Sequence, residues 1–410
     1  MLAALRLEKA FRVLPDVPEL GALREALLGA SAADPQMEWA SAGRYVTFDK
    51  RVLDAVSAGA VIDTARARAL ERVQRLYDGA ARLLASAHAG DDAGVVRELV
   101  GLGEAAEATE DWRQAGSCYA LAATLSAPLP DRTWLVLSLR RLARVRLAAG
   151  ELDEARTLYR AALDQAIAAG DRVGRIVALT GIGNALSFKG QFVEARVHYE
   201  QGVLLCTDED VRLRAQLHIN LAMVAREQER LDEAEAYLQQ ARAGWAVLDS
   251  ADRSGWHNFA GLVALSRRAF GDAEAAFNRA LAEAPGSFER AMITGNLTEL
   301  AIQRRQYQEA AELGRRAEHH ALAAASPRAL AEIYTRLGRL FRLRGDANGV
   351  TFFEKALELC RMHRYLLIEA TAYTEYAEFR QMLGDDEEAR AYHERADTIV
   401  RELGARADAR

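Results

Sequence analysis

The side chains best suited to hold a ligand in this sequence are asparagines and arginines that recur along the chain. An asparagine amide offers both a donor and an acceptor, so a row of them can pair with the backbone of an extended peptide. An arginine fork can hold a carboxylate through two parallel hydrogen bonds. The candidate residues are Asn184, Asn220, Asn258, Asn296, Arg140, Arg144, Arg226, Arg336, Arg339 and Arg342.

Other chemistry finds little support in the sequence. The stretch RIVALTGIGNAL (175–186) contains a Gly-x-Gly turn, but Leu186 stands where a dinucleotide-binding fingerprint needs a small residue. The sequence contains no P-loop, HExxH or GxSxG motif. Cys118, Cys206 and Cys360 are far apart and lack the CxxC spacing of zinc sites. We therefore expect no catalytic residue, no metal and no cofactor.

A repeat defines the elements that must position the asparagines and arginines. The pattern alanine, three residues, an aromatic residue, two residues and a second alanine is clearest in Ala155, Tyr159 and Ala162. Full or weakened copies begin at residues 115, 155, 195, 234, 273, 310, 349 and 389, a spacing of 37 to 40 residues. About twelve residues upstream of most copies stands a small residue, such as Gly183 or Gly261, among apolar residues at helical spacing.

Each repeat is therefore predicted to form two helices joined by a short turn, such as the one at Gly190. Small residues on both helices let the backbones approach closely, and the aromatic residue fills the space against the neighbouring pair. One such hairpin cannot bury its apolar face alone, whereas stacked hairpins can. The sequence thus predicts an all-α fold in the form of a solenoid.

This pattern resembles the tetratricopeptide repeat family over roughly residues 92–403. The period is about five residues longer than the standard 34. It is similar to that of a subgroup found in kinesin light chains and bacterial peptide-sensing regulators, which the stretch INLA (219–222) followed by REQERLDEAEAYL also resembles. The resemblance implies a right-handed superhelix of antiparallel helix pairs, in which the first helix of each pair lines a concave groove.

Helical spacing places the candidate asparagines on or near one stripe of these first helices. Family members that bind peptides use asparagine and basic residues at matching positions, so the resemblance implies a peptide-binding groove. A structural role is the alternative for each residue. An asparagine can bond the adjacent repeat, and an arginine on a solvated face contributes only about 0–1 kcal/mol per exposed ion pair.

Composition and charge limit the remaining possibilities. The 410 residues include only 7 prolines, which favours helices, and the net charge of −6 argues against a general nucleic-acid role. No signal peptide or 18-residue apolar run is evident, so we expect a soluble, cytoplasmic protein without a membrane partner. We expect an N-terminal helical cap over residues 1–90, a solenoid of about eight helix pairs over 91–403 and a frayed tail over 404–410.

Two functions fit this sequence. The first is a non-catalytic scaffold that binds a protein or peptide segment in the groove. The alternative is a sensor or regulator in a bacterial signalling or transcription pathway, in which a ligand changes the pitch of the superhelix. The identity of the partner and the oligomeric state stay open at this point.

Overall fold

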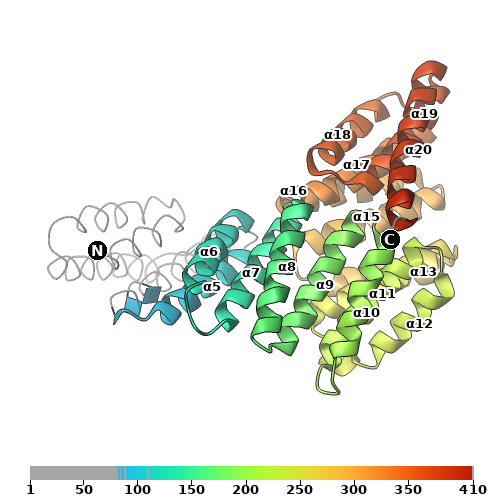
Figure 1. Ribbon diagram of the computed structural model, residues 1–410. Helices are drawn as coiled ribbons and strands as arrows, with labels where there is room; N and C mark the ends of the chain where they lie inside the picture. The colour runs from blue at the N-terminus through green and yellow to red at the C-terminus, as the bar shows by residue number, and fades with distance from the viewer. Residues whose placement is uncertain (1–81, 84, 87–88, 109–110, 409–410) are drawn as a thin grey trace, which may run out of the picture. The chain divides into compact units, whose positions relative to one another are not determined.

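The computed structural model describes residues 82–408, apart from 84, 87–88 and 109–110 (Figure 1). The described residues form sixteen α-helices and one 3-10 helix, with no strand among them. The predicted all-α class of consecutively packed helix pairs is thus confirmed. The predicted N-terminal cap lies almost entirely outside the described residues. No described helix combines the length and the apolar character needed to cross a membrane.

The chain divides into two compact units, one of residues 1–145 with 164–171 and one of residues 146–163 with 172–410. The first unit contains the pair α5 (Asp92–Ala108) and α6 (Trp112–Ser126). The next two helices are α7 (Thr133–Ala148), most of which belongs to the first unit, and α8 (Leu152–Ala168), most of which belongs to the second.

Six complete helix pairs make up most of the second unit. They are α9 (Arg172–Phe188) with α10 (Phe192–Leu205), α11 (Val211–Glu227) with α12 (Leu231–Arg242), α13 (Ser250–Ser266) with α14 (Phe270–Glu283), α15 (Ser287–Gln303) with α16 (Tyr307–Ala323), α17 (Pro327–Leu343) with α18 (Gly349–His363), and α19 (Leu366–Met382) with α20 (Asp386–Asp408). The first helices contact one another in order from α9 to α19, and each second helix contacts the next first helix. The first helices therefore form a continuous layer.

The small and aromatic residues of the repeat motif pack directly against each other. A Cβ added at Gly183 of α9 would lie 2.4 Å from the ring of Tyr199 in α10, which is fully buried. The same relation holds between Gly261 and Phe277, at 2.6 Å. These distances are too short for any side chain, so glycine allows the two backbones of a pair to approach as closely as they do.

In the six pairs from α9 to α20, the turn within each pair passes through a left-handed backbone conformation. Gly190 adopts a φ of 77°, and the equivalent residues Glu229, Arg268 and Arg305 adopt φ values of 59–60°. After α9, the Gly190 N–H donates to Ser187 and the Gln191 N–H donates to Leu186, which closes the helix end with a Schellman motif. A glycine in the sequence therefore marks only some of these turns, because other residues also adopt this conformation, with some loss of stability.

Candidate functional site

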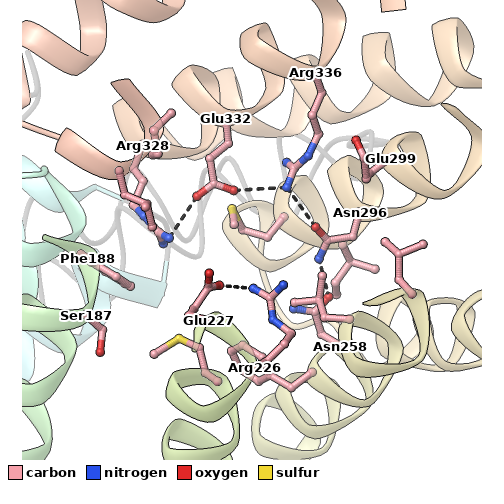
Figure 2. A pocket seen from close by; sticks show the side chains of 18 of the residues that line it. Ser187, Phe188, Arg226, Glu227, Asn258, Asn296, Glu299, Arg328, Glu332 and Arg336 are labelled. Atoms are coloured by element: carbon pink, nitrogen blue, oxygen red, sulfur yellow. Dashed lines mark hydrogen bonds and ion pairs between the residues drawn. The ribbon is translucent and has the colours of Figure 1, made fainter. Parts of the chain in front are cut away.

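The second unit contains a cavity of about 670 Å³, a size typical of ligand sites (roughly 300–1,000 Å³). Every described residue that lines it belongs to a first helix: α9, α11, α13, α15, α17 or α19. Figure 2 shows side chains from several of these helices pointing toward one another across it. The layer of first helices thus supplies the whole described lining.

Apolar side chains make up much of that lining. Met223 comes from α11, Phe259 and Leu262 from α13, and Phe288 and Met292 from α15. These residues are all partly exposed. Burial of such surface against a ligand is favourable by about 25 cal/mol per Å² of apolar area. The cavity can therefore hold apolar ligand side chains as well as polar groups.

The four predicted asparagines all line the cavity, but their hydrogen bonds differ. The Tyr199 hydroxyl donates to Asn184 Oδ1 at 2.7 Å. Burial raises the pKa of Tyr199 well above its usual value, so the hydroxyl keeps its proton. Asn296 Nδ2 donates to Asn258 Oδ1 at 2.9 Å. The Asn220 side chain makes no hydrogen bond to any described residue, so its donors and acceptor are available to a ligand.

The arginines of the cavity are paired with glutamates. Arg226 pairs with its neighbour Glu227 (Figure 2). Arg339 lies 2.9 Å from Glu299 and 3.5 Å from Glu375. The charged lining residues are Arg226, Arg328, Arg336 and Arg339 with Glu227, Glu289, Glu299, Glu332 and Glu375. Because carboxylates balance these guanidiniums, the cavity is not a cationic site for acidic ligands.

The other three predicted arginines lie elsewhere. Arg342 is not among the described lining residues, and it contacts Glu375 at 2.7 Å and Glu378 at 2.9 Å. Arg140 and Arg144 lie on α7 in the first unit, where Arg144 pairs with Glu107. Of the ten predicted residues, the structure therefore brings seven to one cavity.

Sequence reasoning missed a contact that forms part of the cavity wall. The Arg328 guanidinium of α17 lies 3.9 Å from the centre of the Phe188 ring of α9 (Figure 2). Nearby, Leu152 and Tyr365 share a buried cluster, and a Cβ at Gly150 would lie only 1.8 Å from the Tyr365 hydroxyl. Residues near the start of the second unit, on and just before α8 and α9, thus contact α17 and the residue that precedes α19 directly. No spacing in the sequence signals this contact, because it depends on curvature accumulated over several repeats.

Family models match the predicted repeat in two segments of the chain. Tetratricopeptide repeat models match residues 134–203 and 215–241, so this chain contains tetratricopeptide repeats. No curated protein matches the sequence significantly.

Several solved structures are similar in fold. The Rap conjugation gene regulator of plasmid pLS20, in complex with the Phr* peptide, matches with a TM-score of 0.55 and 12% identity, over 85% of this chain and 95% of that chain. BtubC (BKLC) from P. vanneervenii matches with a TM-score of 0.44 and 19% identity, over 52% of this chain and 90% of that chain. At such identities these likenesses concern the fold.

Proposed function

We propose that this chain is a non-catalytic, cytoplasmic peptide-binding protein that holds an extended peptide segment in the cavity of the second unit. The observation that carries the proposal is the Asn220 amide, which has no described partner and lines a cavity rich in apolar side chains. A regulator of similar fold has been solved with a bound peptide, which supports the same use of the fold here.

The lining favours a particular kind of peptide. Its arginines already face glutamates, so acidic side chains on the ligand would compete with existing ion pairs. Apolar side chains can instead cover Phe259 and Phe288, while main-chain groups meet the amides. Packed helices lie about 8–10 Å apart, and an extended chain advances about 3.3 Å per residue. Asparagines on neighbouring first helices would then meet roughly every third peptide residue.

Selection from a displayed library of random peptides on the immobilised full-length chain supplies a probe. Its affinity is measured by fluorescence anisotropy for the wild type, Asn220→Ala and the matched control Asn278→Ala. Asn278 is exposed on α14, a second helix, outside the described lining. Loss of one or two hydrogen bonds predicts about tenfold weaker binding for Asn220→Ala and unchanged binding for Asn278→Ala. Equal affinity of the peptide for both variants would contradict peptide binding in this cavity.

The alternative function, a ligand-responsive regulator, is favoured by the contact between Phe188 and Arg328. A ligand that occupies the cavity beside this contact would alter the equilibrium between closed and open arrangements of the repeats. Small-angle scattering of the full chain, with and without the selected peptide, tests this function. A change in the radius of gyration that Phe188→Ala abolishes is expected of a regulator. Identical curves with and without peptide would contradict the regulator function and favour a scaffold whose shape does not respond to the ligand.

A further inference from the structure

Three polar residues on consecutive first helices form a hydrogen-bonded chain along the cavity wall (Figure 2). Arg336 of α17 donates through Nη2 to Asn296 Oδ1 of α15, at 3.2 Å. Asn296 Nδ2 donates in turn to Asn258 Oδ1 of α13, at 2.9 Å. Asn296 is only 3% exposed, so water cannot replace these partners. We call this chain of three residues the amide relay.

The chemistry of arginine fixes the direction of the amide relay. A guanidinium has donors and no acceptor, so the Asn296 atom that faces Arg336 has to be the carbonyl oxygen. The amino group of Asn296 then faces Asn258, and Asn258 has to accept with its own oxygen. The amino group of Asn258 therefore takes no part in these hydrogen bonds and can donate to a ligand. A reversed relay would set an amino group against the guanidinium and leave a buried donor unpaired, which is costly.

The surroundings hold Arg336 in place. Glu332, one turn earlier on α17, lies 3.5 Å from the same guanidinium and 3.0 Å from Arg328. The Arg336 Nη1 atom packs over Gly295, where an added Cβ would lie 3.0 Å away. A glycine next to Asn296 thus leaves room for the guanidinium, and a carboxylate balances its charge. The end of the relay is therefore pre-organised.

We propose that Arg336 is a positioning residue that sets the direction of the amide relay, so that Asn258 presents its amino group to the ligand. The ligand then has to supply an oxygen acceptor at Asn258. Since the five glutamates of the lining outnumber its four arginines, that acceptor is a neutral main-chain carbonyl of a peptide rather than a carboxylate. The positive charge at the far end polarises both amides and strengthens the last donor. This inference rests on the proposed function and specifies how one subsite works.

The decisive variant is Asn258→Asp, because aspartate still accepts from Asn296 but has no amino group to donate. The probe is the fluorescein-labelled peptide selected on the wild-type chain. We expect about tenfold or greater weakening for Asn258→Asp, with a melting temperature close to that of the wild type. Arg336→Met should weaken binding similarly, and Arg336→Lys, which keeps a donor, should recover part of the loss. Wild-type affinity in Asn258→Asp would overturn the relay.

The same experiment separates this inference from the proposed function. If Asn220→Ala weakens binding and Asn258→Asp does not, the cavity binds peptide but the relay is wrong. If neither variant weakens binding, the proposed function fails.

If neither variant weakens peptide binding, the amide relay can still be tested by a measurement without peptide. In protein labelled with ¹⁵N-asparagine, Arg336→Met should shift the side-chain amide signals of Asn296 and Asn258 and leave those of Asn278 unchanged. Unchanged signals for Asn258 and Asn296 would contradict the relay.

Discussion

The two ends of the cavity carry the same residue type at equivalent helix positions and use it differently. At the end formed by α9 and α11, Asn220 makes no hydrogen bond to a described residue. At the end formed by α15 and α17, Asn296 is buried and bonds both Arg336 and Asn258. The neighbouring repeat determines the difference, because Arg336 supplies a donor beside Asn296. Whether an asparagine of this layer is bonded or left open to the cavity therefore depends on the side chains of the next repeat.

The largest expected effect tests the packing that supports both ends. Phe277 of α14 is fully buried against Gly261 of α13, the helix pair between the two ends. Phe277→Ala leaves a cavity and should lower the free energy of unfolding by about 3–5 kcal/mol. Urea unfolding followed by circular dichroism measures the loss. A loss below that of Asn296→Ala would show that the pair core contributes less than the layer of first helices.

The next largest effect tests whether Asn296 and Asn220 differ in their contribution to stability. Asn296→Ala leaves Asn258 and Arg336 without their shared partner, so the expected cost is about 1–3 kcal/mol. Asn220→Ala removes no hydrogen bond and should change stability by less than about 0.5 kcal/mol. Parallel urea titrations of the two variants check the difference. Similar losses for both would mean that the two asparagines have equivalent structural roles.

A third effect is the dependence of stability on pH at the starts of α9 and α11. Asp210 pairs with Arg172 and accepts hydrogen bonds from the Thr207 N–H and hydroxyl, and these contacts lower its pKa to about 2. A carboxyl with a lowered folded-state pKa stabilises the fold above its unfolded pKa of about 3.9, and the contribution is lost as pH falls toward 2. Asp210→Asn should therefore be less stable than the wild type at pH 7. The gap between their urea midpoints should narrow from about pH 5 downward, and a constant gap would contradict this assignment.

The smallest effect has the opposite sign. Glu229, in the turn after α11, has a φ of 59°, whereas the equivalent residue after α9 is Gly190. Glu229→Gly relieves the left-handed strain and should raise the free energy of unfolding by up to about 1 kcal/mol. Gly190→Ala should lower it by a similar amount. Thermal melting of both variants tests the pair, and a destabilised Glu229→Gly variant would show that the glutamate side chain compensates for the strain.

The sequence was sufficient to predict the helix pairs and to place the four asparagines on or near one stripe of the first helices. Periodicity carries that information, because small and aromatic residues such as Gly183 and Tyr199 must meet at a fixed register. It could not distinguish Asn220 from Asn296, since that depends on which side chain of the next repeat lies beside each amide. It also could not foresee that Arg339 pairs with Glu299, 40 residues earlier, or that Phe188 meets Arg328. Those contacts depend on how the repeats stack and curve.

The most direct measurement of the central claim uses the six asparagines of this chain. Selective ¹⁵N-asparagine labelling gives six pairs of side-chain amide signals, one pair for each NH2 group, assigned by single substitutions. Four belong to the cavity, and Asn278 and Asn348 lie outside its described lining. On titration with the selected peptide, we expect the signals of Asn220 and Asn258 to shift and those of Asn278 and Asn348 to stay in place. Saturable binding that leaves the Asn220 and Asn258 signals unmoved would contradict it.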